Sequence, residues 1–451
     1  MHSRRVPGAV CWVLGAGVGC GVLGAVPGAV PGVGCGVLGA RVAAQALTIP
    51  TPVIRVSFTD AIQRAQEKNP TVAAAAASIL RAEGLIRQAR SASQFQVFAN
   101  VTSTTLNRGV EFDGATVTPR SQLTATLTAD VPIVAAAAWA RRAQAEDTKA
   151  VAELDVADVK RQIAFATADA YLAILASRRV VESNTLARDT AKAHFDLATE
   201  LEQGGTGSRL NALRAQQQFS VDSGLVEVAQ LSLYRAQEAL GVLIVADGPA
   251  DATDEPDFAA QAAPPVAAFS NTNLIRTDLK LLSAQRQAAE RIVRDTTKEW
   301  YPTLDAIFQP STTYPAQFFL PQNSWRFLLQ ANIPIFDSGL RSSERTQRQA
   351  DVEQFSASLS RALLDANAQV RAARQAVASG ERTLALASAA LEQAQQVVNI
   401  TNVSFRAGAA TNIEVIDAER VARDNGLAVA IAEDQLRRAR LELLNALGRF
   451  P

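Results

Sequence analysis

Two copies of one sequence unit fill most of this chain, and no other feature constrains the fold as strongly. The second copy follows the first by about 202 positions, so we expect both copies to adopt the same fold. We assign a first repeat to residues 47–245, an exposed linker rich in Ala, Pro and Asp to 246–272, and a second repeat to 273–451. The matching segments are Val131-Pro132-Ile133 with Ile333-Pro334-Ile335, and Asp222-Ser223-Gly224-Leu225 with Asp424-Asn425-Gly426-Leu427.

Each repeat is predicted to contain two strands, one very long helix, a turn and shorter helices. The long helices, at 135–203 and 340–406, would each be roughly 100 Å long at 1.5 Å per residue, far beyond a globular helix. The shorter helices of one repeat have almost the same total length and could stack end to end beside the long one. The other predicted elements are strands at about 94–106, 121–132, 302–314 and 324–335, turns at 204–208 and 405–411, and helices at 70–93, 208–245, 273–299 and 411–447.

The second long helix carries a heptad pattern. Large apolar residues from Leu363 to Val398 recur every seven positions, and small residues from Ala366 to Ala394 recur in the same frame. This pattern predicts a left-handed supercoil in which small side chains let neighbouring backbones approach closely. An intracellular coiled-coil scaffold would show the same pattern, so the helices alone leave that class open.

The predicted strands alternate apolar and polar side chains over about ten residues, the length that a tilted strand needs to cross an outer membrane. Leu127 and Leu329 belong to the apolar set, whereas Thr126 belongs to the polar one. A soluble sheet with one wet face is the alternative, but the helices are committed to coiled-coil seams and cannot cover its apolar face. Aromatic residues at the strand ends, expected for a membrane interface, are Trp300, Tyr301, Tyr314 and Trp325.

Four strands cannot close a barrel, and lipid does not tolerate an open sheet edge. The chain must therefore assemble if these strands cross a membrane. Two copies would supply eight strands and three copies would supply twelve, which leaves room for an aqueous lumen. The polar set of side chains, mostly Gln, Thr, Asn, Ser and Asp, suits such a lumen better than a packed interior.

Composition excludes several functions. All three cysteines lie in the first 46 residues, which excludes cysteine nucleophiles, thiolate metal sites and disulfides from the rest of the chain. His194 is the single histidine beyond residue 46, and we interpret it as a solvated helix residue because charged side chains surround it in sequence. We expect no catalytic residue, cofactor or metal site. With 44 basic and 44 acidic residues, the chain gives no electrostatic reason to expect nucleic acid as a partner.

Residues 1–46 have the features of a secretory signal peptide. Arg4 and Arg5 precede an apolar, glycine-rich stretch, and Ala44-Gln45-Ala46 supplies a small-x-small cleavage pattern. We expect export with cleavage after Ala46. An N-terminal membrane anchor is the alternative, although glycine at this density disfavours a helix.

Three motifs occur in order along the duplicated frame. They are Phe58-Thr59-Asp60-Ala61 before Asn69-Pro70, Ile333-Pro334-Ile335-Phe336-Asp337-Ser338-Gly339, and Phe405-x-x-Gly408 before Glu414-Val415-Ile416-Asp417-Ala418. The set resembles the TolC-like outer-membrane efflux factor family across residues 47–451. Pro132, Pro334 and Gly339 mark the two strand-to-helix turns of this pattern. The first repeat departs from it, because four alanines follow Val134 where the family has an aromatic-Asp-Gly run.

The resemblance implies a mainly α fold with a small membrane β part. Three chains would form a homotrimer, with a 12-stranded barrel in outer-membrane lipid and a long α-helical tunnel in the periplasm. The linker at 246–272 would lie in an equatorial region around the tunnel. The implied function is the exit duct of a tripartite efflux or type I secretion system. It would conduct substrates passively from an inner-membrane pump, joined through a periplasmic adaptor protein.

Other classes have less support in the sequence. An enzyme would need clustered titratable groups in a pocket-forming segment, and no such cluster is recognisable. A periplasmic coiled-coil adaptor or scaffold is the nearer alternative, but it would lack the repeat and the bilayer-length strands.

The resemblance also assigns site residues. Glu414 and Asp417 match the acidic positions of the family's periplasmic gate, where three chains would bring six carboxylates around one aperture. Glu414 also fits a capping box with Thr411, and would then only stabilise the start of its own helix. The tip turns for adaptor docking contain Gly204, Gly205, Gly207 and Gly408. We expect positive φ at Gly205 and Gly408, where a helix must stop and reverse.

Overall fold

The computed structural model describes residues 53–113, 115–258 and 276–450. The predicted signal peptide and the second half of the predicted linker, residues 259–272, lie outside the described residues.

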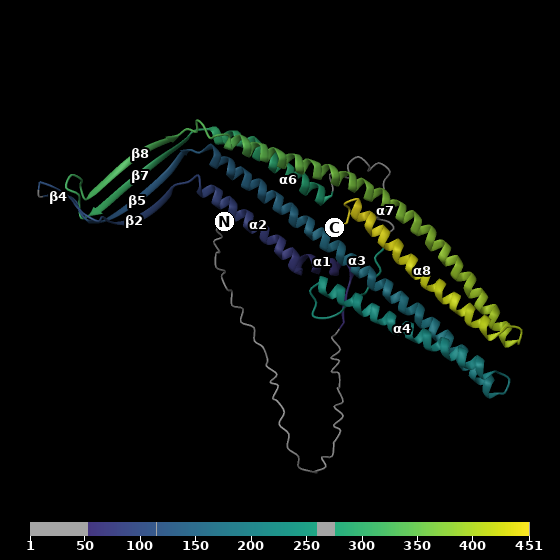
Figure 1. Ribbon diagram of the computed structural model, residues 1–451. Coiled ribbons are helices and arrows are strands. Elements are labelled where there is room, and N and C mark those ends of the chain that lie inside the picture. The colour runs from purple at the N-terminus through teal and green to yellow at the C-terminus, as the bar shows by residue number, and fades with distance from the viewer. Residues whose placement is uncertain (1–52, 114, 259–275, 451) are drawn as a thin grey trace, which may run out of the picture. The chain divides into compact units, whose positions relative to one another are not determined.

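Four strands form one antiparallel sheet in the order β2-β5-β7-β8 (Figure 1). Their bounds are β2 Gln96–Thr105, β5 Ser121–Val134, β7 Thr303–Tyr314 and β8 Asn323–Asn332. Each repeat supplies one strand pair, and the pairs join where β5 lies against β7. The fold class predicted from the sequence, mainly α with four strands per chain, is confirmed.

β8 ends three residues before its predicted end. Pro334 explains this difference, because proline has no N–H with which to continue the strand ladder. In the first repeat β5 continues past Pro132 only through a shift of register between Pro132 and Val134.

Two small β elements were not predicted from the sequence. A hairpin of β3 (Val110–Phe112) and β4 (Ala115–Thr118) is inserted between β2 and β5. A parallel pair joins β1 (Ile54–Val56) to β6 (Ala250–Ala252). Strands of three or four residues give too little alternation for the sequence pattern to reveal them.

Helices make up most of the described chain. Their bounds are α1 Phe58–Lys68, α2 Pro70–Ser91, α3 Ala136–Gln203, α4 Arg209–Leu243, α6 Thr277–Asp295, α7 Leu340–Arg406 and α8 Asn412–Ala446, with a 3-10 turn, η2, at Thr296–Trp300. Among the described residues, no helix contains an apolar stretch long enough to cross a membrane.

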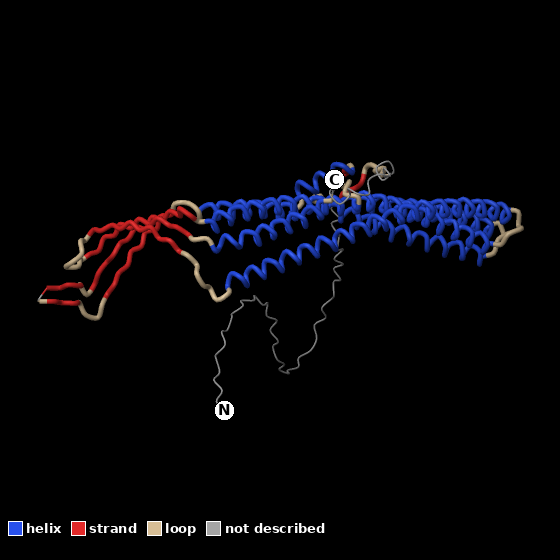
Figure 2. The backbone as a smooth tube through the Cα atoms, turned by 90° about the horizontal axis from the view of Figure 1, so that it is seen from above, coloured by secondary structure: helices blue, strands red, loops and turns tan. Residues whose placement is uncertain are grey.

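Within each repeat, two shorter helices lie beside the long one. α2 and α4 pack on α3, and α6 and α8 pack on α7 (Figures 1 and 2). The shorter helices meet end to end through polar contacts. Asn69 Nδ2 donates to the carbonyl of Leu243 at 3.1 Å, and Arg276 Nη1 donates to the carbonyl of Ala446 at 3.5 Å. The stacking that the helix lengths suggested is therefore present in both repeats.

The heptad prediction for α7 is confirmed by burial. The buried residues of α7 are all small ones from the predicted seam: Ala366, Ala373 and Ala394. Gly380 shows why they must be small, because a Cβ added there would lie 3.3 Å from Cδ1 of Leu436 in α8. The small residues of α7 therefore let the leucines of α8, such as Leu436 and Leu443, pack closely against it.

The largest buried cluster surrounds the middle of α3. Tyr171 is fully buried there, and its ring contacts Phe58 edge-on with centroids 5.4 Å apart. Its hydroxyl donates to the carboxylate of Asp254 and accepts the N–H groups of Thr253 and Asp254. Burial, followed by the bond to Asp254, raises the pKa of Tyr171 to about 12. The protonated tyrosine thus fastens the segment that follows β6 to the long helix.

Candidate functional site

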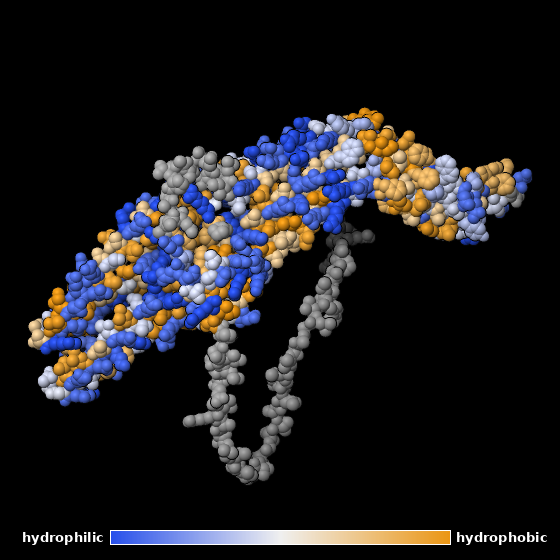
Figure 3. Space-filling model, turned by 180° about the vertical axis from the view of Figure 1, so that it is seen from behind, coloured by the Kyte–Doolittle hydropathy of each residue, from blue (hydrophilic) through white to orange (hydrophobic). Residues whose placement is uncertain are grey.

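One face of the sheet is apolar and exposed. Leu127 in β5 is 44% exposed and Leu329 in β8 is 62% exposed. Cross-strand pairing places neighbours such as Phe308 and Phe327 on the same face. Figure 3 shows apolar side chains gathered over the strands. Exposed apolar patches of this kind are typical of surfaces that meet lipid or another protein.

The opposite face of the sheet is polar and internally hydrogen-bonded. Thr128 in β5 accepts a bond of 3.1 Å from Nε2 of Gln309 in β7. Oε1 of Gln309 in turn accepts from Nε of Arg326 in β8 at 2.6 Å. The two faces therefore separate as the alternation predicts. β2 and β8 are the outer strands of this sheet, so each has a free edge within the described chain.

The predicted aromatic residues lie at both ends of the second strand pair. Trp300 and Tyr301 directly precede β7, Tyr314 ends it, and Trp325 lies near the start of β8. All four side chains are exposed. The guanidinium of Arg341 lies over the Trp300 ring, 5.2 Å from its centroid, at the point where sheet and helix meet.

The two strand-to-helix turns differ. In the second repeat, Gly339 has φ +88° and precedes α7, and the carboxylate of Asp337 accepts the N–H groups of Gly339 and Arg341. In the first repeat, Ala135 precedes α3 without a side-chain hydrogen bond. This difference follows from the sequence, where the first repeat lacks the Asp-x-Gly run.

At the other end of the helices, two tight turns connect α3 to α4 and α7 to α8 (Figure 2). Gly205 has φ +73° and Gly408 has φ +76°, so the expectation of positive φ is confirmed at both. Gly204 has ordinary helical φ and ends α3. A side chain at Gly207 would clash with the backbone, because an added Cβ would lie 2.8 Å from the backbone nitrogen of Glu202.

Glu414 and Asp417 lie on the first turns of α8. Glu414 forms the capping box, since its carboxylate accepts the N–H of Thr411 at 2.8 Å. Asp417 is exposed and pairs with Arg420 at 2.7 Å. Both carboxylates border a groove of about 440 Å³ between α7 and α8, which Val397 and Ile400 line on the apolar side. Glu414 thus caps its own helix, and Asp417 forms an exposed ion pair within α8.

His194 is buried, and the prediction of a solvated residue was wrong. It is 5% exposed, lies 5.5 Å from the Phe405 ring, and places Nε2 2.7 Å from Oδ1 of Asn412. Burial lowers its pKa, so the ring is neutral near pH 7. The charged neighbours in sequence lie on other faces of α3. The informative signal was the helical spacing, because His194 shares one stripe with the buried Ala191 and Ala198.

Several further links join α8 to the first repeat, and sequence reasoning missed them all. The α8 residues involved are neutral, basic or acidic. Ordinary solvated helices contain the same residue types, so the residue types give no sign of these contacts. The pairs are Asn412 with His194, Arg423 with Asp222, Glu433 with Arg179, Arg438 with Asp169, and Asn445 with Arg161. They fix the second helical hairpin on the first along most of the length of α8.

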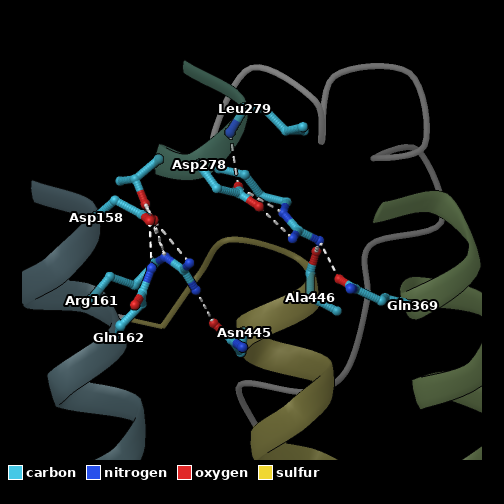
Figure 4. Close-up of polar contacts among 10 residues, drawn as sticks. Asp158, Arg161, Gln162, Asp278, Leu279, Gln369, Asn445 and Ala446 are labelled. Carbon is cyan, nitrogen blue, oxygen red and sulfur yellow. Dashed lines mark hydrogen bonds and ion pairs between the residues drawn. The ribbon is translucent and has the colours of Figure 1, made fainter. Parts of the chain in front are cut away.

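Figure 4 shows where the second repeat begins and ends on the first. Asp158 of α3 is buried and accepts from Arg161 at 2.9 Å and from Thr277 at 2.8 Å. Beside it, Arg276 pairs with Asp278 at 2.7 Å. Burial alone would raise the pKa of Asp278, but the bonds from Arg276 and Leu279 N–H bring it below the usual range. The lowered pKa keeps Asp278 ionised at neutral pH, so its pair with Arg276 is maintained there.

Comparison with known proteins gives one family. The sequence profile described as outer membrane efflux protein matches residues 61–244 and 270–449. The chain is 29% identical over 322 residues to the pyoverdine export outer membrane protein OpmQ of Pseudomonas aeruginosa. That match covers 68% of this chain and 66% of the relative, a little under two thirds of its length.

Solved structures share the fold at low sequence identity. The outer membrane protein VceC of Vibrio cholerae superposes with a TM-score of 0.73 at 18% identity, covering 87% of this chain and 96% of that one. The open state of the MtrE outer membrane channel of Neisseria gonorrhoeae gives a TM-score of 0.74 at 16% identity, covering 87% and 88%.

Proposed function

The chain belongs to the outer membrane efflux protein family, and from this premise we propose that three copies form the exit duct of a tripartite efflux or type I secretion system. An outer-membrane location with helices in the periplasm agrees with the relatives and structural neighbours. Three copies would supply twelve strands, which pairs every free edge of β2 with an edge of β8 in the next copy. The duct would conduct substrates passively toward the exterior.

The observation that carries this proposal is the two-faced sheet joined directly to two helical hairpins. Its exposed apolar face, with Leu127 and Leu329, suits lipid. Its hydrogen-bonded polar face, with Thr128, Gln309 and Arg326, suits a water-filled lumen. The aromatic residues at both ends of β7 and β8 would lie at the two membrane interfaces. A periplasmic adaptor or scaffold would not be expected to contain a sheet with an exposed apolar face, because it does not cross the membrane.

At the periplasmic end, we assign the turns around Gly205 and Gly408 to adaptor docking. Two turns per chain and three chains give six similar tips, a number suited to a sixfold ring of adaptor hairpins. Asp417, with Glu414 beside it, would contribute to a ring of carboxylates at the aperture. An adjacent inner-membrane pump would supply the energy.

Reconstitution tests the duct directly. Purified full-length protein should run as a heat-modifiable trimer, measured by native mass spectrometry. It should also open ion-conducting channels in planar lipid bilayers. Recovery of a monomer from the periplasmic fraction without detergent would contradict the proposal and favour the adaptor or scaffold class.

A further inference from the structure

An ion pair between the carboxylate of Asp222 and the guanidinium of Arg423 connects α4 to α8. Asp222 of α4 is 4% exposed and accepts from Nη1 of Arg423 in α8 at 2.6 Å. Gln218 Nε2 also donates to Asp222 at 3.0 Å. Nε and Nη2 of Arg423 donate to the carboxylate of Asp424. The pair lies about 18 Å along α8 from the tip turn at 1.5 Å per residue. It therefore holds the tip end of α8 against the first repeat.

Glu419 is a further ionisable group at this link. It precedes Arg423 by one helical turn, so both side chains project from one side of α8. Its Oε2 is buried and has no hydrogen-bond partner among the described residues. Burial, followed by the negative charge of Asp222, raises the pKa of Glu419 to about 7. This carboxyl therefore changes its charge within the pH range that a periplasm experiences.

A cavity of about 590 Å³ adjoins the cluster, between α3, α4, α7 and α8. Its charged lining residues are Arg179 and Glu182 from α3, Asp222 from α4, and Glu419, Arg423 and Glu433 from α8. α7 contributes two amides, Gln395 and Asn399, and two apolar residues, Leu391 and Val398. Of the two lining arginines, Arg179 pairs with Glu433 and Glu255, whereas Arg423 pairs with Asp222. The charged groups at this cavity can hold water there if the charge of the cluster rises.

We propose that protonation of Glu419 controls the strength of the Asp222–Arg423 link between the two repeats. A neutral Glu419 leaves the ion pair undisturbed. An ionised Glu419 repels Asp222 and competes for Arg423, so the buried cluster takes up water and the link loosens. The link is tight in acid and loose in mild alkali. Because the tight form raises the pKa above the ordinary value of 4.5, its advantage is complete below that pH and is lost as the pH rises through about 7.

A distance measurement tests the switch. Cysteine is absent beyond residue 46, so Gln217→Cys on α4 and Ala428→Cys on α8, both exposed, can be spin-labelled specifically in the full-length protein once Cys11, Cys20 and Cys35 are replaced by Ser. Double electron–electron resonance between pH 5 and 9 should show longer distances in alkali. The transition should have a midpoint near pH 7 and span about two pH units, as expected for one proton.

Two variants make the test decisive. Glu419→Gln should keep the acid-form distances at every pH, because the amide cannot ionise. Glu442→Gln removes an exposed carboxylate from the same helix and should leave the midpoint unchanged. Wild-type distances that do not depend on pH, or a Glu419→Gln protein that keeps the wild-type midpoint, would overturn the proposal.

The consequence for transport rests on the proposed function and needs a separate readout. Bilayer conductance of wild type should rise through pH 7, whereas that of Glu419→Gln should not. Conducting channels with pH-independent distances overturn the switch and leave the duct intact. A pH-dependent distance in a protein that forms no channels supports the switch and contradicts the duct.

Discussion

Nε2 of His194 lies 2.7 Å from Oδ1 of Asn412, so a buried hydrogen bond joins the two repeats beside their tip turns. Asn412 is the first residue of α8, and its Nδ2 also donates to the carbonyl of Asn211 in α4 at 3.3 Å. One amide thus connects three helices, α3, α4 and α8, beside the tip turns. This arrangement makes the tip a defined structure rather than two independent turns.

We predict that Asn412→Ala destabilises the helical hairpins by about 1–3 kcal/mol, because it leaves the buried imidazole of His194 without its partner. Urea unfolding followed by circular dichroism measures the loss. Ile413→Ala, an exposed neighbour on the same turn, is the matched control and should cost much less. Equal effects of the two variants would show that the bond contributes little.

The same bond predicts a pH dependence. Burial lowers the pKa of His194 below its ordinary value of 6.5, so the folded protein resists protonation of this ring. Stability should therefore be complete above pH 6.5 and decline as the pH falls below it. His194→Gln should flatten this part of the stability profile. A profile that His194→Gln leaves unchanged would assign the acid sensitivity to other groups.

The sheet faces predict a contrast between adjacent residues of β5. Leu127→Lys should place a charge in lipid and cost about 2–4 kcal/mol near the bilayer midplane. Thr126→Lys, one residue earlier, should face the lumen and be tolerated. The yield of heat-modifiable trimers in outer-membrane fractions measures both. Similar losses from the two variants would contradict the assignment of faces.

The tip turns predict loss of efflux without loss of assembly. Gly205→Val and Gly408→Val each force a β-branched side chain into positive φ, at a cost of roughly 1–2 kcal/mol. We expect trimers to remain in the membrane while substrate efflux is abolished. Gly224→Ala, within α4 where an added Cβ meets open space, is the control. Normal efflux from both valine variants would remove the docking role.

The carboxylates predict cation behaviour at the tip. Asp417→Asn should weaken divalent-cation block and cation selectivity in bilayer recordings, because it removes three negative charges from a trimer. Glu414→Ala should in addition loosen the start of α8, since Glu414 completes the capping box. Selectivity and block that stay unchanged when both residues are replaced would show that they do not line the aperture.

The sequence by itself determined the repeat, the long helices and the two faces of the strands. Each depends on a local regularity: the 202-residue offset, the heptad that buries Ala366 and Ala373, and the alternation that separates Leu127 from Thr126. Positive φ at Gly205 and Gly408 was predictable for the same reason, because a reversing helix needs it within a few residues.

Only the tertiary structure decided how the repeats are fastened together. The burial of His194, the link of Asp222 to Arg423 and the isolation of Glu419 all depend on side chains that meet across some 200 residues of sequence. Apart from the alanine stripe beside His194, no local pattern distinguishes such polar residues from those of a solvated helix face. Their burial and their pKa values follow from which helix lies opposite, and packing alone determines that.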